Sequence, residues 1–461
     1  MTEETFDLVV LGGGGGGVPA AIRASQLGGR VCLVESTHLG GLCMNRGCIP
    51  FCQMMTASGV LGPLSFANEL GLHTREPLKD FGALVRRQQD LISHMTQGVK
   101  GLLAKNAVQL LEGRGRVVSK GKVQIGNRII SCNGLILATG AEWVKPGFPG
   151  ADLDDIVDGD YFLHTNVLPG RVLLYGLSPW TVEVAQFLNR FGSSVVLATP
   201  DKRLLADESP SISSRLKKSL IADRITVKTS AGILAARKEA DRLEVDLQLK
   251  EGVETVAVDK VAILDRRAAI GNLGLRVIGL SENDPFLKVN ERMETGVEGV
   301  YAIGDLTGPL SRHYSSLASA GGLVAAENVM GVRATINPKT FSRVLYTQPQ
   351  LASVGLTRED AKKKGYEVLV GSAPYSMNAM GMILSEEEGI VEIVAEKKYG
   401  EVLGVHFFGA FATEMAGHGI LAIQMEMTLE EVSRIPFPHP TLSESLSEAA
   451  RDAMGRAIYL P

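Results

Sequence analysis

The chain has 461 residues, a length typical of about three domains. Its 45% hydrophobic and 21% charged residues exclude wholesale disorder, and its formal net charge of −4 excludes the basic surface by which proteins bind nucleic acid or acidic membranes. Glycine is enriched at 52 residues without a three-residue period, which indicates many close backbone approaches and excludes a collagen-like fibre.

The start of the sequence lacks the basic segment of a secretion signal, and no run of about 18 apolar residues occurs anywhere in the chain. We therefore expect a cytoplasmic protein without a membrane span. The five cysteines are too few for a disulfide scaffold in a chain of this length.

The first predicted unit is a strand, a turn, a helix and a second strand. Residues 6–11 (FDLVVL) form the apolar run of a buried parallel strand, six glycines follow at 12–17, and residues 19–26 have a helical pattern. The second strand, at 31–34, ends at Glu35. Together these segments predict a βαβ unit.

Within the glycine run, Gly12, Gly14 and Gly17 have the spacing G-x-G-x-x-G. This spacing allows a tight turn, close approach of the backbone to a pyrophosphate, and close packing of helix on strand, with the anion at the helix N-terminus. Glu35 lies 23 residues after Gly12, where an acid accepts hydrogen bonds from a ribose diol. A flexible glycine linker is the alternative, and the flanking strand, helix and acid argue against it.

A pair of cysteines follows in residues 40–50 (GGLCMNRGCIP). A disulfide between Cys43 and Cys48 is sterically possible near a predicted helix start, where thiolate is favoured over thiol, as a redox-active pair requires. Two buried cysteines that act as small hydrophobes are an alternative. A zinc site is another, although His38 has poor spacing and no second ligand pair follows, so no metal is expected.

The pattern of strand, glycine turn and helix occurs again later. Residues 171–176, 181–192 and 193–199 repeat it about 160 residues after the first unit, which suggests two nucleotide-type domains. Residues 300–305 (VYAIGD) predict a strand that ends in Gly-Asp, followed by a helix from about 315.

After Val344 the pattern changes. Short strands at 389–398 and 401–409 precede a helical segment at 412–425. This order predicts a separate α+β domain that continues to the end of the sequence.

Four segments resemble those of the flavoprotein disulfide oxidoreductases, and most closely the dihydrolipoamide dehydrogenase branch. They are the cysteine segment 40–50, the second and third FAD segments at 135–140 (LILATG) and 300–305, and the C-terminal signature 439–444 (HPTLSE). The resemblance covers the whole chain. It implies an α/β fold with two Rossmann-like domains, one for FAD and one of NAD type, and a C-terminal α+β dimerisation domain.

The implied domains are an FAD-binding domain over 1–150, a nucleotide domain over 151–274, a central segment over 275–345 that packs on the FAD domain, and a dimerisation domain over 346–461. The resemblance also implies a set of FAD-binding residues. These are Gly12, Gly14, Gly17, Glu35, Gly41, Gly113, Thr139, Gly140 and Asp305, of which the last binds the ribityl chain.

The resemblance assigns four catalytic residues. Cys43 is the thiol that exchanges with the substrate, and Cys48 is the charge-transfer thiolate against the flavin. His439 is the base, which reaches the disulfide of the other subunit of a homodimer, and Glu444 orients it. The alternative for the last motif is a helix capping box with Thr441 as N-cap and Glu444 at the third position.

The second glycine turn departs from the family. Only Gly176 of its three glycines remains, because Ser178 and Thr181 occupy the other two positions, and Thr199 stands where NAD-dependent members carry a ribose-binding Glu. The family segment Gly-Arg-x-Pro-Asn reads Asp-Arg-Arg-Ala-Ala at 265–269. These changes make NAD(H) a doubtful cofactor.

Further departures lie near the expected flavin. Phe51 and Cys52 replace the family's Ser or Thr and the Lys that pairs with a Glu, while that partner remains as Glu183. A buried Glu without its cation should protonate or find another donor. Cys52 is either a third redox thiol or a packing residue, and Trp180 either fills the nicotinamide position or belongs to the core. Ser316 replaces a family histidine, next to an insertion around 311–314.

These observations predict an FAD-dependent oxidoreductase that oxidises dihydrolipoamide, on a lipoyl carrier protein, through Cys43 and Cys48. Its NAD(H) use is weakened or replaced by another electron acceptor, such as a redox protein or a quinone. One alternative is a conventional NAD-dependent dihydrolipoamide dehydrogenase. The other is a non-catalytic, FAD-stabilised structural subunit of a lipoyl-enzyme complex.

Overall fold

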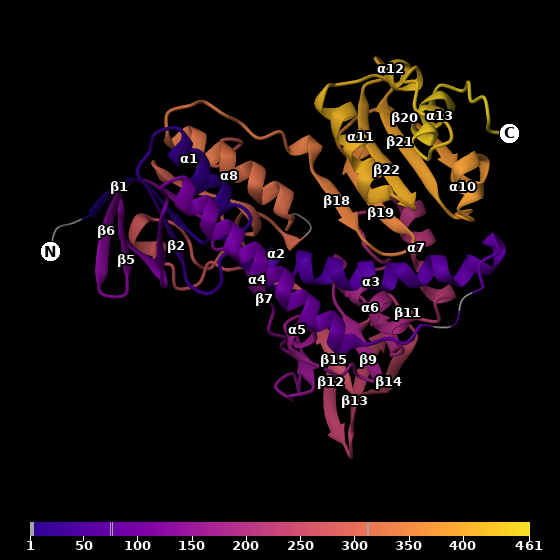
Figure 1. Cartoon of the computed structure of the whole chain (residues 1–461), viewed down its shortest axis with the longest axis horizontal. Coiled ribbons are helices and arrows are strands. Elements are labelled where there is room, and N and C mark those ends of the chain that lie inside the picture. Colours follow the sequence, from indigo (N-terminus) through magenta and orange to yellow (C-terminus); the bar gives the residue numbers. More distant parts are fainter. Residues whose placement is uncertain (1–3, 74, 76, 311–312) are drawn as a thin grey trace.

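The computed structural model describes residues 4–73, 75, 77–310 and 313–461. The chain forms three lobes, with the N-terminus in the first lobe and the C-terminus in the third (Figure 1). The fold is α/β with two Rossmann-like domains and a C-terminal α+β domain, as the sequence predicts.

The first lobe is built on a seven-stranded sheet. Its central strands are parallel and buried on both faces, which explains their nearly continuous apolar sequences. In spatial order the strands are β3 (Gln109–Glu112), β2 (Val31–Glu35), β1 (Glu4–Leu11), β6 (Arg128–Leu137), β5 (Lys122–Ile125) and β4 (Gly115–Ser119), and β17 (Val300–Ala302) also pairs with β6.

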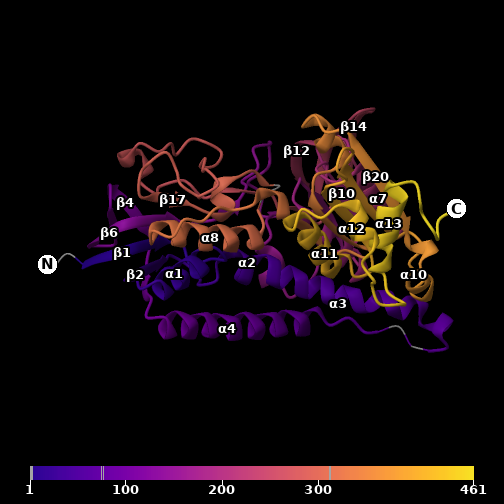
Figure 2. The same cartoon turned by 90° about the horizontal axis from the view of Figure 1, so that it is seen from above.

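Helices cover this sheet and lead away from it. α1 (Gly17–Gln26) packs against α8 (Ser315–Val329), so the segment after 300 returns to the first lobe. α4 (Phe81–Lys105) forms an outer layer beneath α1 and α3 in Figure 2. The short α2 (Gly41–Arg46) leads directly into α3 (Cys48–Phe66).

The second lobe repeats the parallel arrangement. Its helices are α5 (Tyr161–His164), α6 (Pro179–Arg190) and α7 (Pro210–Ala222). Its parallel sheet has the order β11 (Thr226–Lys228), β10 (Ser194–Ala198), β9 (Arg171–Tyr175), β15 (Lys260–Ile263) and β8 (Ile156–Val157). An antiparallel sheet of β12 (Gly232–Glu239), β13 (Arg242–Leu249) and β14 (Gly252–Val258) and the pair β7 (Ala141–Trp143) and β16 (Arg266–Ala268) complete it.

The third lobe is an antiparallel sheet with helices on it. The helices are α9 (Arg358–Lys363), α10 (Ala379–Ile383), α11 (Ala412–Gln424), α12 (Leu429–Ser433) and α13 (Glu444–Ala453). The strands, in spatial order, are β18 (Ser342–Leu345), β19 (Gln350–Gly355), β22 (Val402–Gly409), β21 (Ile390–Glu396) and β20 (Val368–Pro374). The sheet thus begins at Ser342, and the domain boundaries given above remain predictions.

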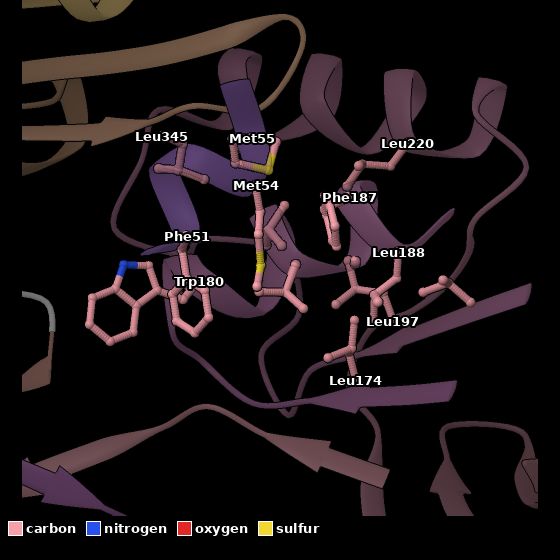
Figure 3. Close-up of a cluster of buried hydrophobic side chains, with 14 of the residues drawn as sticks. Phe51, Met54, Met55, Leu174, Trp180, Phe187, Leu188, Leu197, Leu220 and Leu345 are labelled. Atoms are coloured by element: carbon pink, nitrogen blue, oxygen red, sulfur yellow. The ribbon is translucent and has the colours of Figure 1, made fainter. Parts of the chain in front are cut away.

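The start of α3 lies where the lobes meet (Figure 1). Figure 3 shows Phe51 and Met54 of α3 beside Trp180 and Phe187 of α6, in a core that also includes Leu345. Each fully buried side chain of this kind stabilises the fold by roughly 1.5–3 kcal/mol. The core therefore fixes the start of α3, and Cys48 with it, against the second lobe.

Candidate active site

A cavity of about 340 Å³ opens at the carboxyl ends of β1, β2 and β6, where ligands bind in open α/β sheets. It is lined by most of the residues that the sequence predicts for FAD binding: Gly12, Gly14, Glu35, Gly41, Gly113, Thr139, Gly140 and Asp305. Gly17 is not among the lining residues. A Cβ at Gly17 would lie 1.8 Å from the Gly12 carbonyl oxygen, so this glycine permits helix and strand to touch.

The cavity has two features of a dinucleotide site, a close approach of glycine backbones and a fixed carboxylate. Gly14 and Gly41 approach so closely that a Cβ at Gly41 would lie 2.7 Å from the Gly14 Cα. The Glu35 carboxylate accepts the Gly13 N–H at 2.7 Å and the Thr37 N–H at 2.7 Å, which fixes it at the end of β2. An acid held at this place, after a glycine turn at a helix N-terminus, fits the adenosine end of FAD.

Gly14→Ala should weaken FAD binding without unfolding the chain. Its Cβ would lie 3.6 Å from the Gly41 Cα, an ordinary contact, yet it would occupy the wall that the pyrophosphate approaches. We expect at least about a tenfold rise in the FAD dissociation constant, measured by flavin release during dialysis. The matched variant Gly17→Ala, whose Cβ has no space, should instead lower the thermal stability of the whole protein. Equal FAD retention by Gly14→Ala and the unmodified protein would contradict this prediction.

Cys43 and Cys48 both line the same cavity, and both are free thiols in this structure. A hydrogen bond from the Cys48 thiol lowers the pKa of Cys43, and the Ser315 side chain lowers it further. The same hydrogen bond, together with burial, raises the pKa of Cys48 well above its usual value. A thiol whose pKa is lowered by a hydrogen bond from its neighbour has the property of a nucleophilic thiol.

Sequence reasoning missed three residues that line the cavity near the cysteines. Arg266 is buried and pairs with Asp305 at 3.3 Å between Nη1 and Oδ2. His313 is also buried, and its Nε2 lies 3.0 Å from the Gly308 carbonyl oxygen while its Nδ1 lies 3.9 Å from Asp305. The third is Ser315, which contacts Cys43.

The sequence contained an indication for one of these three residues and a neighbouring position for another. Arg266 is the arginine that remains from the altered segment 265–269. Ser316, which we expected at the family histidine position, is exposed. Of the insertion around 311–314, Ser311 and Arg312 lie outside the described residues.

His439 and Glu444 form the pair that the sequence predicts. The His439 Nδ1 lies 3.1 and 3.2 Å from the two Glu444 carboxylate oxygens. The imidazole is 72% exposed and is not part of the cavity that holds the cysteines, so one chain does not bring the two groups together. An exposed, oriented imidazole is what a site completed by a second subunit requires.

The capping-box alternative for this segment is wrong. α13 begins at Glu444 with Ser443 as its N-cap, and the Thr441 hydroxyl donates to the Pro438 carbonyl oxygen at 2.7 Å. Only half of the expected reciprocal bonding occurs, in which the Glu444 carboxylate accepts the Thr441 N–H at 3.0 Å. The carboxylate is thereby held between a backbone N–H and the imidazole of His439.

The second glycine turn lies at the end of β9, at the start of α6. Gly176 follows the last residue of the strand, Ser178 is the N-cap of α6, and Thr181 lies in the first turn of that helix. The hydroxyls of Ser178 and Thr181 are buried without a hydrogen-bond partner within the chain. Thr199 is buried at the end of β10, and its N–H donates to the Lys228 carbonyl oxygen at 2.9 Å.

Trp180 fills space beside the redox segment. Its ring lies 5.2 Å from Phe51 and 5.9 Å from Trp143 between centroids, and the Arg266 guanidinium lies 3.8 Å above it. A Cβ at Gly47, next to Cys48, would lie 2.4 Å from this ring. The indole thus belongs to the core shown in Figure 3 and also packs against Gly47, the residue before Cys48.

Glu183 is fully buried and lacks the lysine of the family. Its Oε1 accepts the Tyr346 N–H at 2.7 Å, and burial raises the pKa of Glu183 to about 7. Cys52 lies nearby on α3, where burial and the charge of Glu183 raise the pKa of its thiol. Cys52 does not line the cavity, which favours the packing interpretation over a third redox thiol.

Glu183→Gln should stabilise the protein increasingly as the pH rises. The folded-state pKa of about 7 lies above the ordinary value of 4.5, so the native carboxyl holds its proton longer than the unfolded one. Its ionisation costs up to about 3 kcal/mol of folding free energy above pH 7, at about 1.4 kcal/mol per pH unit between the two values. Gln can still accept the Tyr346 N–H. Thermal unfolding at pH 5 and pH 8 tests this, and a difference independent of pH would contradict it.

A dinucleotide cavity with a thiol pair in its wall, and an oriented histidine in a C-terminal sheet domain, define a flavin-dependent disulfide oxidoreductase. Comparison with known families agrees. The chain belongs to the pyridine nucleotide-disulphide oxidoreductase family, whose model matches residues 6–324, and the dimerisation-domain model of that family matches residues 341–450. This domain bears out the expected homodimer.

Among curated proteins the chain is similar to dihydrolipoyl dehydrogenases. It is 35% identical to that of Thermus scotoductus over 99% of both chains, and 31% identical to that of Bacillus subtilis over 98% of this chain and 99% of the relative. The fold resembles that of LpdA from Mycobacterium tuberculosis, with a TM-score of 0.88 at 21% identity over 97% and 99% of the two chains.

The family's cofactor is FAD, and the cavity residues fit it. FAD supplies a two-electron acceptor beside Cys43 and Cys48 when bound. Within the described residues no group of His, Cys, Asp or Glu could hold a metal ion. No helix in the described part of the chain is long and apolar enough to cross a membrane.

Proposed function

We propose that this protein oxidises dihydrolipoamide, on a lipoyl carrier protein, through the Cys43–Cys48 disulfide and FAD. The thiol half of this proposal is supported by the lowered pKa of Cys43 beside Cys48 in the cavity. The lipoyl substrate is supported by the relatives, which are named dihydrolipoyl dehydrogenases over nearly their whole length. The expected cytoplasmic location is part of this proposal.

The thiol reaction moves two electrons and two protons from the substrate dithiol to the Cys43–Cys48 disulfide, which becomes a dithiol. A substrate thiolate attacks one sulfur of the Cys43–Cys48 disulfide, that bond breaks, and the second substrate thiolate displaces the first cysteine to close the substrate disulfide. Each attacking thiol must lose its proton, and we propose that His439 of the other subunit, oriented by Glu444, takes up each proton in turn and passes it to the cysteine thiolate that leaves. The reduced pair then stands beside the bound flavin.

The second part of the proposal is that NAD(H) is not the principal electron acceptor. The single observation that carries it is the second glycine turn, where Ser178 and Thr181 put side chains at two of the three glycine positions of the family, at the start of α6. An efficient pyrophosphate site uses its backbone amides without such side chains. We therefore propose a redox protein or a quinone as the acceptor.

The test is anaerobic titration of the holoenzyme with dihydrolipoamide, and separately with NADH and NADPH, while the flavin and charge-transfer bands are recorded. Reduction by dihydrolipoamide without a response to either nucleotide supports both parts of the proposal. Rapid reduction by NADH would overturn the second part and leave a conventional NAD-dependent enzyme. Failure of dihydrolipoamide to reduce the flavin would overturn the first part and favour the structural subunit.

A further inference from the structure

The backbone amides of the second glycine turn are already bonded to a carboxylate of the chain itself. The Leu177 N–H donates to the Asp265 carboxylate at 2.8 and 3.1 Å, and the Ser178 N–H donates to the same group at 2.7 Å. Asp265 lies 88 residues from Leu177 in the sequence, so only the fold brings these groups together. Backbone amides at this turn are the groups by which a Rossmann-like domain binds a pyrophosphate.

Asp265 is held firmly in this place. It follows β15, and its own carbonyl oxygen accepts the Val144 N–H at 2.9 Å. Its carboxylate lies against Gly176, where a Cβ would come within 2.6 Å of Oδ1. The one glycine that remains of the turn therefore gives space to this carboxylate.

The two Rossmann-like sheets show what this position does in a domain with a cofactor cavity. In the first lobe β1 and β6 align Leu11 with Leu137, and in the second lobe β9 and β15 align Tyr175 with Ile263. Thr139 lies two residues after Leu137, and Asp265 lies two residues after Ile263. The two residues therefore occupy corresponding positions in the two lobes. Thr139 lines the cavity of the FAD domain.

Two further positions of the turn also have no free N–H that could bind a ligand. Pro179, the first residue of α6, has no N–H. The Thr181 N–H donates to the Ser178 carbonyl oxygen at 3.0 Å. Together with the two amides bonded to Asp265, four positions at this helix start cannot donate to a pyrophosphate without rearrangement.

We propose that Asp265 is a specificity-determining residue that excludes pyridine nucleotides from the second lobe by occupying their anion site with its own carboxylate. This inference rests on the proposed function, in which NAD(H) is not the principal acceptor. A carboxylate competes for the same amides as a phosphate, and it repels the phosphate charge at close range. The glycine that the family carries at this position has neither effect.

The test compares Asp265→Gly with the unmodified holoenzyme. NAD⁺ binding is measured by isothermal titration, and flavin reduction by NADH and NADPH is followed anaerobically. We expect Asp265→Gly to bind NAD⁺ at least about tenfold more tightly, because two charge-assisted hydrogen bonds no longer compete. Asp265→Asn keeps the volume and one acceptor oxygen but not the charge, and it should gain less affinity than Asp265→Gly.

A matched control removes another carboxylate of the second lobe that also accepts a backbone N–H. Asp259 accepts the Arg171 N–H at 2.8 Å at the opposite end of β9 and β15. Asp259→Gly should leave NAD⁺ binding as weak as before. Bound FAD and reduction by dihydrolipoamide report whether each variant is folded, and Asp265→Ala replaces Asp265→Gly in the comparison if the glycine variant loses its FAD.

The outcomes separate this inference from the proposed function. If the unmodified enzyme ignores NADH and both Asp265→Gly and Asp265→Ala bind NAD⁺ no better, the inference is overturned while the proposed function stands. If the unmodified enzyme is reduced rapidly by NADH, the inference and the second part of the proposed function are overturned, while the proposed oxidation of dihydrolipoamide stands. Tighter NAD⁺ binding by Asp265→Gly but not by Asp259→Gly supports the inference.

Discussion

Cys43→Ser should abolish oxidation of dihydrolipoamide, with a loss of about 10³-fold or more in kcat/KM. Serine has nearly the same size, but it cannot form a disulfide with Cys48 or accept attack by a substrate thiolate. FAD should remain bound, because Cys43 contributes one wall of a cavity whose glycine turn is unchanged. Turnover with dihydrolipoamide and an artificial electron acceptor measures the loss.

Cys52→Ser is the matched control for this variant. Cys52 lies on α3 one turn after Cys48, but it does not line the cavity. Its replacement should leave turnover unchanged. Full turnover by Cys43→Ser would contradict the assignment of the redox pair, and loss of turnover in Cys52→Ser would restore the interpretation of Cys52 as a third redox thiol.

His439→Gln should lower kcat for dihydrolipoamide by about 10²–10⁴-fold, the usual contribution of a positioned general base. Glutamine fills similar space and can still hydrogen bond with Glu444, but it cannot take up a proton. Single-turnover reduction of the flavin by dihydrolipoamide measures this step directly. A decrease of less than about tenfold would argue that proton transfer does not depend on His439.

A hybrid dimer tests whether His439 serves the other subunit. Two differently tagged chains, one with Cys43→Ser and one with His439→Gln, are expressed together and the mixed dimer is purified. If the base acts across the dimer, one of the two sites joins an intact Cys43 to an intact His439, and about half of the normal activity remains. If the base acts within its own chain, neither site is intact and no activity remains.

The reciprocal hybrid gives the opposite expectation. One chain carries both Cys43→Ser and His439→Gln, and its partner is unmodified. Action across the dimer then leaves no intact site, whereas action within a chain leaves one. Activity in this hybrid together with inactivity in the first would contradict the proposed active site.

The sequence alone was sufficient for the parts of the molecule that depend on near neighbours along the chain. Strands, glycine turns and helices lie close to where their patterns predict them, because each pattern reflects local backbone geometry and burial. The paired positions of Cys43 with Cys48 and of His439 with Glu444 are also local, since at most five residues separate the partners.

Local patterns were misleading where the same residues fit two different structural interpretations. The segment from Thr441 to Glu444 has the letters of a capping box, yet α13 begins at Glu444, and the Glu444 carboxylate is held by His439 and the Thr441 N–H. The position Ser316 followed from alignment alone, and the neighbour Ser315 is the residue that contacts Cys43.

Only the tertiary structure decided which distant groups meet in the sites. Arg266 pairs with Asp305, Glu183 bonds to Tyr346, and the Asp265 carboxylate occupies the amides of the second glycine turn. These partners are 39, 163 and 87 residues apart, and no periodicity or spacing relates them. The physical reason is that strand order in each sheet, rather than order along the chain, determines which strand ends lie side by side.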